Sequence, residues 1–194
     1  MTRRITIIDA HPDPDPARFC HALAAAYASG AIAAGHETRL IRLADKDIPI
    51  LRTRAEWEGG AVPPAVADAQ GDIAWAHHIV ILYPLWLGEP PALLKAFLEQ
   101  ALRPGFAFSA TDKPFSGGHL KGRTARVVVT MGMPALVYRL WFGSRSLETL
   151  KRNILAFVGI GPTASTVIGG VEDLTAPARQ RWLDRLRDCG REGR

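Results

Sequence analysis

The chain of 194 residues contains 47% apolar and 22% charged residues, which is ordinary for a soluble globular protein and fits a single domain over residues 1–194. Its two cysteines, Cys20 and Cys189, are too few for a disulfide framework or a metal knuckle, which fits a reducing cytosol. The net charge of +5 does not indicate a nucleic-acid partner, because aromatic side chains are not interleaved with the basic ones as stacking platforms require.

The start of the chain has the pattern of a strand. Residues 1–9 combine a basic start with a short apolar stretch that ends in Asp9, and they lack the small-residue cleavage site of a signal peptide. No apolar run in the sequence approaches the roughly 18 residues that a membrane helix needs. We therefore expect a first strand at Arg4–Asp9 in a cytoplasmic protein with no membrane insertion.

Strand-length apolar runs and helical patterns alternate along the rest of the chain. The periodicity predicts helices over residues 17–34, 65–76, 91–102, 146–157 and 176–189, the first of them closed by Gly35. It predicts further strands over residues 36–43, 78–83, 124–131 and 163–169. The run at 78–83 is apolar throughout, which is typical of a parallel strand buried on both faces, whereas 36–43 alternates polar and apolar residues as an edge strand does.

Five strands separated by helices predict an α/β fold with a parallel sheet that is covered on both faces. Right-handed crossovers leave few topologies, and the most polar strand belongs at an edge. The pattern therefore predicts the doubly wound, flavodoxin-like, five-stranded parallel sheet of order 2-1-3-4-5. In such sheets ligands bind outside the carboxyl ends of the strands, beside the switch point between strands one and three. Those ends fall at residues 9–12, 83–87 and 130–132.

Several common site motifs are missing from the sequence. There is no G-x-G-x-x-G after the first strand, no Walker P-loop and no G-x-S-x-G elbow. The adjacent His77 and His78 would point to opposite faces of a strand, so we do not expect them to share a metal ion. We predict no metal site.

The first loop, HPDPDPARFCHAL, runs from His11 directly into the N-terminus of a predicted helix. Free backbone N–H groups and the helix dipole favour a phosphate at such a terminus. His11 and Arg18 would add hydrogen bonds or charge. The alternative is a proline-stiffened connector with a capping role.

The second loop offers residues 84–87 as a flat apolar wall with backbone N–H groups that can bond the edge of a ring. The third loop places Thr130 and Gly132 opposite this wall, and it is followed by PALVYRLWF, whose Trp141 and Phe142 are more typical of a core. A phosphate site at one loop and a planar ring between two others describe a flavin.

The segments HPDPDPARFCHAL, YPLWLGEPPALLKAFLEQALRPGFAF and VTMGMPALVYRLWFG resemble the flavodoxin-like NAD(P)H:quinone oxidoreductases, which include the modulator-of-drug-activity and potassium-efflux ancillary oxidoreductases. The resemblance covers residues 5 to about 172. It implies FAD or FMN as the cofactor, NAD(P)H as the co-substrate and a quinone-like small molecule as the hydride acceptor. It also implies a homodimer with the flavin at the interface.

The resemblance assigns roles to residues by position. The cofactor-binding residues would be His11, Arg18, Phe19 and Cys20 at the phosphate, Pro84, Leu85, Trp86 and Leu87 at the isoalloxazine, and Thr130, Met131 and Gly132 in the third loop. The catalytic residue would be Tyr138, and the substrate slot would be lined by Trp86, Tyr138 and, from a second subunit, Phe106 and Phe108.

The chain departs from the family pattern at the phosphate and at the reacting centre. Ala17 and Cys20 stand where the family commonly has serine and asparagine, and the histidine that partners the tyrosine in animal members falls near Ser144. A second hypothesis is therefore a flavodoxin-like accessory or regulatory subunit with weak or no flavin binding. Its contact surface would be residues 103–152, which hold nine Lys and Arg against Asp112 and Glu148.

Overall fold

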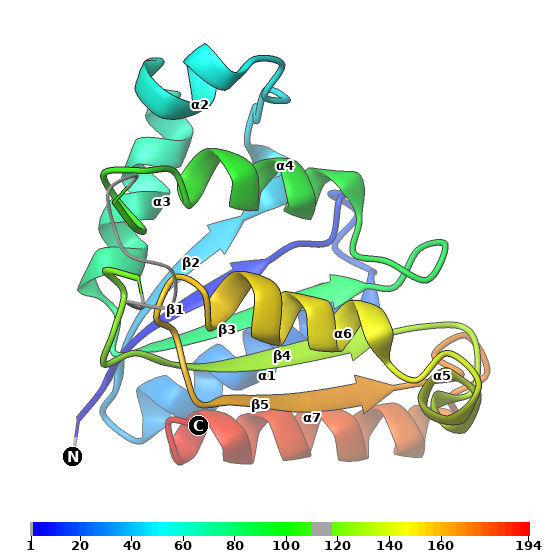
Figure 1. The fold of residues 1–194 in the computed structure, drawn as a ribbon. Coiled ribbons are helices and arrows are strands. Elements are labelled where there is room, and N and C mark those ends of the chain that lie inside the picture. The colour runs from blue at the N-terminus through cyan, green and yellow to red at the C-terminus, as the bar shows by residue number, and fades with distance from the viewer. Residues whose placement is uncertain (1, 110–117) are drawn as a thin grey trace.

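The computed structural model describes residues 2–109 and 118–194, and its centre is a five-stranded parallel sheet (Figure 1). The strands are β1 (Arg4–Asp9), β2 (Glu37–Arg42), β3 (His78–Pro84), β4 (Thr124–Thr130) and β5 (Thr163–Ile168). Their order is β2-β1-β3-β4-β5, so the predicted flavodoxin-like order is confirmed. The switch point between β1 and β3 therefore lies where the sequence predicts a ligand site.

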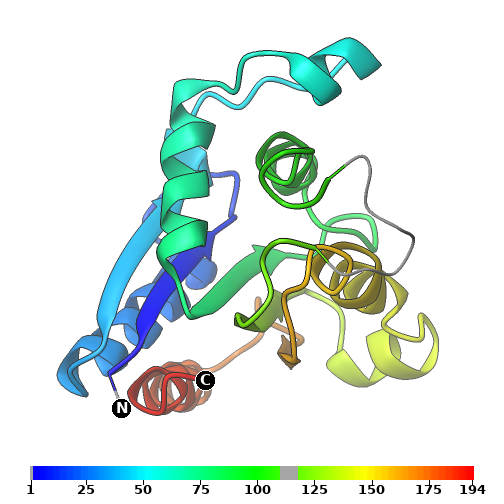
Figure 2. The ribbon, with the colours of Figure 1, turned by 60° about the vertical axis from the view of Figure 1, so that its left-hand side comes forward.

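Helices cover both faces of the sheet (Figures 1 and 2). One face carries α1 (Phe19–Ala33) and α7 (Ala176–Arg191), and the other carries α3 (Pro64–Trp75), α4 (Ala92–Ala101) and α6 (Arg145–Thr149), which continues into a π-helical segment at Leu150–Leu155. Within the described ranges, no helix is long and apolar enough to cross a membrane.

The alternation of side chains along each strand fills two cores. Ile5 and Ile7 of β1 pack against α1 and α7, whereas Ile8 faces the core that holds α3 and α4. The strands β3 and β4 are buried almost throughout, while β2 is largely exposed, as the polar pattern of an edge strand predicts. Because both faces are covered, the carboxyl edge of the sheet is the part of it that a ligand can reach.

The two helices of the first face approach each other very closely. A Cβ atom added to Gly30 of α1 would lie 1.9 Å from the carbonyl oxygen of Arg187 in α7, and one added to Gly190 would lie 2.1 Å from the carbonyl oxygen of Tyr27. These backbone-to-backbone contacts require glycine at both positions. The packing fixes α1, and with it the loop that precedes α1 at the carboxyl edge.

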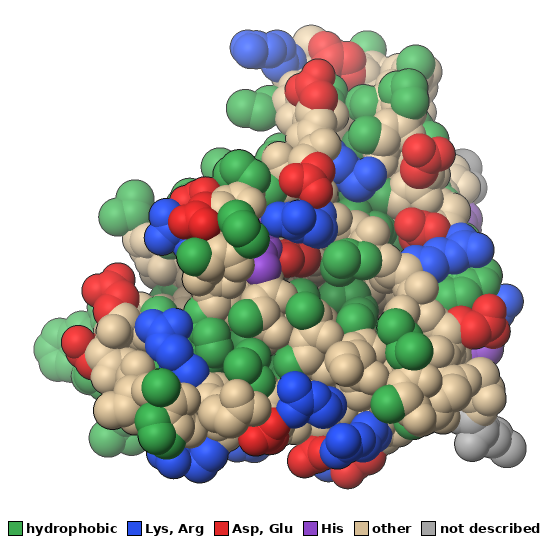
Figure 3. Space-filling view, turned by 180° about the vertical axis from the view of Figure 1, so that it is seen from behind, with side chains coloured by type: hydrophobic (Ala, Val, Ile, Leu, Met, Phe, Trp, Pro, Cys, Tyr) green, Lys and Arg blue, Asp and Glu red, His purple; other side chains and the backbone are tan. Residues whose placement is uncertain are grey.

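Two short helices were not predicted. The helix α2 (Arg54–Gly59) begins after Thr53, whose side chain accepts a hydrogen bond from the amide of Glu56, and α5 (Ala135–Leu140) begins after Pro134. Each has six residues, which is too short for a hydrophobic period to show in the sequence. The face seen in Figure 3 carries interspersed basic and acidic side chains.

Candidate cofactor site

A cavity of about 450 Å³ opens at the carboxyl edge of the sheet, between the loops that follow β1, β3 and β4. It is also lined by the segment that follows β5. Its position is the one that parallel α/β sheets use for ligands, and its volume is typical of a small-molecule site.

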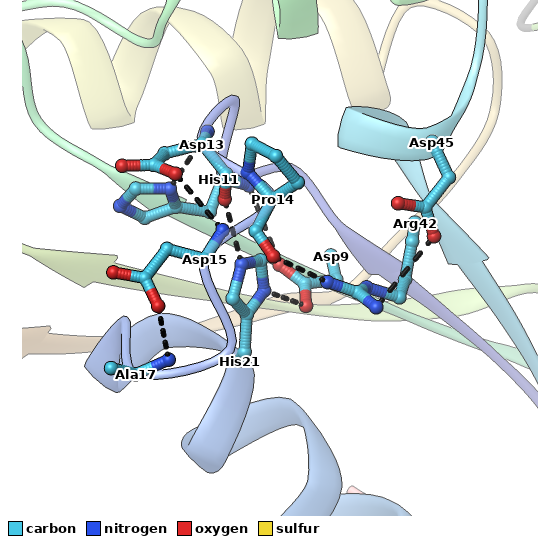
Figure 4. A network of polar contacts seen from close by, with 9 residues as sticks. All are labelled: Asp9, His11, Asp13, Pro14, Asp15, Ala17, His21, Arg42 and Asp45. Atoms are coloured by element: carbon cyan, nitrogen blue, oxygen red, sulfur yellow. Dashed lines mark hydrogen bonds and ion pairs between the residues drawn. The ribbon is translucent and has the colours of Figure 1, made fainter.

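The loop after β1 is built from aspartates that bond to the backbone two residues on (Figure 4). The carboxylate of Asp13 accepts a hydrogen bond from the amide of Asp15 at 2.9 Å, and that of Asp15 accepts one from the amide of Ala17 at 3.0 Å. Such turns, alternating with prolines, fix the loop without regular secondary structure. The predicted proline-stiffened loop is therefore also a loop of aspartate turns.

The N-terminus of α1 presents free donors to the cavity. Arg18 is the residue that caps the helix, and its side chain makes no capping hydrogen bond. The amides of Phe19 and Cys20, both of which line the cavity, donate to no acceptor in the part of the chain that the structure describes. Two N–H groups at the positive end of a helix dipole are therefore available to an anionic group.

Arg18 lines the cavity, but its charge is already paired. Its guanidinium contacts the Asp13 carboxylate at 2.6 Å and lies 3.7 Å from the Asp15 carboxylate. The hydrogen bond from the Asp15 amide, together with Arg18, holds the pKa of Asp13 below its usual value, so Asp13 stays ionised at neutral pH. A phosphate would have to compete with Asp13 for Arg18.

His11 is held as a neutral hydrogen-bond donor. Its Nδ1 accepts a hydrogen bond from the amide of Asp13 at 3.2 Å, so in the neutral ring the proton lies on Nε2. Burial, and secondly the nearby His21, lower the pKa of His11, which favours this neutral form. The ring also meets Trp86 edge-on at a centroid distance of 6.2 Å, and so joins the first loop to the second.

The structure adds a buried pair that the sequence analysis missed. Nδ1 of His21 lies 2.5 Å from the Asp9 carboxylate, and its Nε2 lies 2.9 Å from the carbonyl oxygen of Asp13 (Figure 4). Both side chains are buried, with 9% of His21 and 2% of Asp9 exposed. The only signals in the sequence are an acidic residue at the end of a strand and a histidine in the first turn of the following helix.

The second loop supplies an apolar wall. Pro84, Leu85 and Trp86 line the cavity, and the amide of Leu85 donates to the carbonyl of Thr130 at 2.7 Å, which ties this loop to the third. Trp86 and Glu89 then bond to each other across a tight turn in which Leu87 and Gly88 both have positive φ. Leu87 is fully exposed and does not line the cavity, and Trp86 is half-exposed.

The third loop brings two of its three predicted residues to the cavity. Thr130 and Gly132 line it, whereas Met131 is buried and lies outside its lining. Tyr138 is also buried, and its hydroxyl lies 2.8 Å from the hydroxyl of Ser146 and accepts a hydrogen bond from the amide of Leu147 at 3.3 Å. The structure of the single chain therefore does not place Tyr138 against the cavity.

Phe106 and Phe108 lie away from the cavity, where they pack against the core of α3 and α4. The ring of Phe108 contacts Trp57 at 5.7 Å and Phe157 at 5.1 Å. Their predicted contribution from a second subunit stays a prediction, because it concerns a partner chain.

The segment after β5 contributes lining residues that were not predicted: Val171, Glu172 and Arg179. The guanidinium of Arg179 donates to the carbonyls of Val171 and Leu174, and it lies 5.1 Å from the centre of the Phe19 ring. No motif marks these residues. The signal was topological, since the loop after the fifth strand reaches the same edge of the sheet as the other three.

His77 and His78 make separate structural contacts. Nδ1 of His77 accepts from the amide of Arg4 at 3.3 Å, and Nδ1 of His78 lies 2.6 Å from the Thr124 hydroxyl. Burial lowers the pKa of His78 to about 4, so the ring is neutral at physiological pH. Across residues 2–109 and 118–194, no group of three or more His, Cys, Asp or Glu side chains is placed to hold a metal ion.

Comparison with known proteins places this site in a family. The family model described as "Flavodoxin-like fold" matches residues 3–188. The chain belongs to this flavodoxin-like family. Curated proteins similar to this chain include an uncharacterized NAD(P)H oxidoreductase of Haemophilus influenzae, which is 27% identical over 64% of this chain and 62% of its own length. The ribosyldihydronicotinamide dehydrogenase [quinone] of Mus musculus is 26% identical over 73% of this chain and 64% of its own length.

Solved structures agree on the fold of this flavodoxin-like protein. An NAD(P)H:quinone oxidoreductase from Methanothermobacter marburgensis superposes with a TM-score of 0.82 at 21% identity, covering 99% of this chain and 97% of the other. An FMN-dependent NADH-azoreductase from Bacillus anthracis, solved in complex with FMN, superposes with a TM-score of 0.76 at 19% identity, covering 97% and 98%. The resemblance drawn from the sequence is confirmed by the family and by the names of these relatives. The matches span less than two thirds of the length of the two curated relatives.

Proposed function

We propose that the protein is a flavin-dependent NAD(P)H dehydrogenase (quinone), which transfers hydride from NAD(P)H through bound FAD or FMN to quinones or related electrophiles. The observation that carries the proposal is one cavity at the switch point of the sheet with an anion-binding end and an apolar wall. The family and the names of the relatives support it.

The residues present fit a flavin. At one end, the amides of Phe19 and Cys20 and Nε2 of His11 are donors without an acceptor among the described residues, which suits a phosphate. At the other end, Pro84 and Leu85 offer an apolar surface for the ring system. FMN and FAD share both features, and a flavin supplies the two-electron chemistry when bound.

The chain's own residues would bind the flavin, orient its ring and exclude water from it. Leu85 and Trp86 would cover the ring, and Thr130 and Gly132 would lie opposite them, as their positions around the cavity allow. Gly132 faces Glu172 closely, since a Cβ added there would lie 3.4 Å from Oε1 of Glu172. The catalytic role of Tyr138 remains a proposal, because its hydroxyl would have to leave Ser146 to donate to a ligand.

We further propose a homodimer in which the face of α5 is covered. The expectation that Trp141 and Phe142 belong to a core is wrong, because they are 83% and 43% exposed. Leu136 and Leu140 are 66% and 76% exposed, and apolar side chains project at the left edge of Figure 3, on the side of α5. Contiguous exposed apolar surface of this kind marks an interaction site. The same assembly would place the partner beside the cavity, as the resemblance to the family implies.

The test is the purified protein itself. We expect a yellow preparation, or a colourless one that takes up FMN or FAD and then oxidises NAD(P)H only when a quinone is added. Mass spectrometry of the released cofactor would decide between FMN and FAD, and separate assays with NADH and NADPH would identify the donor. A protein that binds neither flavin at micromolar concentration would contradict the proposal.

One observation favours the accessory-subunit hypothesis, namely that Arg18 is neutralised by Asp13 at the phosphate end. The basic stretch gives it less support. Arg103, Arg123 and Arg126 donate to backbone carbonyls within the fold, and Lys113 lies outside the described residues. Flavin titration therefore separates the two functions, because an accessory subunit would remain colourless after reconstitution.

A further inference from the structure

We propose that His21 is a positioning residue that clamps the loop after β1 in the shape in which His11 and the start of α1 receive the flavin phosphate. The inference rests on the proposed function. It concerns a histidine that lies behind the cavity, outside its lining, and that touches no ligand position directly.

The partners of His21 fix the orientation of its ring. Its Nδ1 faces the Asp9 carboxylate at 2.5 Å, and its Nε2 faces the carbonyl oxygen of Asp13 at 2.9 Å. A carbonyl oxygen only accepts hydrogen bonds, so Nε2 is the donor to Asp13. The Asp9 carboxylate faces Nδ1, and both side chains are buried.

The contacts join three parts of the fold. Asp9 is the last residue of β1, Asp13 lies in the middle of the loop, and His21 lies in the first turn of α1 (Figure 4). The hydrogen bonds from the amides of Asp15 and Ala17, and the one from Arg42 to the carbonyl of Pro14, are exposed to solvent. The amide of His11 also donates to the buried Asp9 carboxylate, but at the longer distance of 3.4 Å. The contacts of His21 are therefore the shorter part of the buried attachment of this loop to the sheet.

The clamp acts on the phosphate donors through Asp13. The carbonyl of Asp13 is held by His21, and the amide of the same residue donates to Nδ1 of His11, which leaves Nε2 of His11 as the donor for a ligand. Loss of the His21 bond would release Asp13 and with it the orientation of His11. The chain thus substitutes an internal histidine for side chains that would contact the phosphate directly.

The experiment compares FMN with riboflavin, which lacks the phosphate, by quenching of flavin fluorescence. Two variants of His21 each keep one of its two contacts. The amide nitrogen of asparagine takes the place of Nδ1, which faces Asp9, and that of glutamine takes the place of Nε2, which faces the carbonyl of Asp13. His21→Asn keeps the bond to Asp9 and loses the bond to the carbonyl of Asp13. We therefore expect its FMN dissociation constant to rise about tenfold or more, the effect of one lost hydrogen bond, while its riboflavin dissociation constant stays nearly unchanged. His21→Gln keeps the bond to the carbonyl of Asp13, so its affinity for FMN should fall clearly less than that of His21→Asn.

His36→Asn is the matched control. His36 also uses both ring nitrogens, towards the amide of Arg3 and the carbonyl of Arg191, but at the opposite edge of the sheet. Its loss should lower the melting temperature without changing the ratio of FMN to riboflavin affinity. A change in that ratio for His36→Asn as large as for His21→Asn would overturn the inference.

The outcomes separate the inference from the proposed function. A wild-type protein that binds neither flavin contradicts the function. If the wild-type protein binds FMN better than riboflavin, and His21→Asn shows the same ratio of FMN to riboflavin affinity, the clamp is overturned while the proposed function stands. Should His21→Asn fail to fold, nitrogen-15 NMR of the wild-type protein decides. A proton on Nε2 of His21 supports the clamp, and an unprotonated Nε2 overturns it.

Discussion

Asp13→Asn should tighten the binding of FMN. In the wild-type structure the Asp13 carboxylate holds the guanidinium of Arg18 through contacts of 2.8 Å from Nε and 2.6 Å from Nη2. Asparagine keeps an oxygen that can accept from the amide of Asp15, so the turn survives, but it removes the charge that occupies Arg18. Arg18 then becomes available to a phosphate at the adjacent helix terminus.

The size of the effect follows from the exposure of the pair. The side chains of Arg18 and Asp13 are 49% and 35% exposed, so their ion pair is screened by water and its loss should hardly change stability. A charge-assisted hydrogen bond gained by a phosphate is typically worth about ten- to hundredfold in affinity. We therefore expect the FMN dissociation constant of Asp13→Asn to fall by about tenfold, with riboflavin unchanged.

The assay is fluorescence titration with FMN and riboflavin at low and at high salt. The gain for FMN should shrink at high salt, because a freed guanidinium acts through its charge. Asp15→Asn is the control, since Asp15 lies 3.7 Å from Arg18 and is the weaker partner. An unchanged or weaker FMN affinity in Asp13→Asn would refute the reasoning. It would mean that the Asp13 carboxylate stabilises the shape of the loop and does not keep Arg18 from a phosphate.

Three further predictions test the ring wall, the reacting centre and the packing. Trp86→Ala should weaken FMN and riboflavin alike, by about three- to tenfold in fluorescence titrations, because the half-exposed indole would contact the ring and not the phosphate. Tyr138→Phe should slow the bleaching of bound flavin by NAD(P)H in stopped-flow by about 10²-fold if its hydroxyl is a general acid, whereas an unchanged rate with about 1 kcal/mol less stability would mean that it only holds Ser146. Gly30→Ala should destabilise the fold to urea by about 2–4 kcal/mol, because its Cβ would enter the backbone of α7, while Gly71→Ala, which has open space in α3, should stabilise it by about 0.5–1 kcal/mol.

The sheet could be predicted because its signals are local. The apolar run at 78–83 and the polar alternation at 36–43 reflect burial on two faces and on one, and these patterns predict the strand order. The carboxyl ends of the strands then located the loops of the cavity. Short helices such as α2 and α5 left no such signal, since six residues do not complete two helical turns.

The site could be predicted only to the level of its loops. His11, Phe19 and Thr130 line the cavity as expected, because loops that follow adjacent parallel strands must meet. The pairing of Arg18 with Asp13 and the exposure of Leu87 depend on turn geometry that the sequence does not state. Tyr138 lies behind the third loop because α5 turns its hydroxyl towards Ser146, a contact between residues eight apart in sequence.

The charges of the first loop explain how a chain with Ala17 and Cys20 at its phosphate end can still bind an anion. Asp13 offsets Arg18, so the loop offers an anion little net positive charge. What remains for the ligand are neutral donors, the amides at the start of α1 and Nε2 of His11. Donors of this kind bind through oriented dipoles, and their strength depends on how rigidly they are held. A loop without strong phosphate side chains therefore depends on its attachment to the sheet, and in this chain His21 supplies part of that attachment through its contacts with Asp9 and with the carbonyl of Asp13.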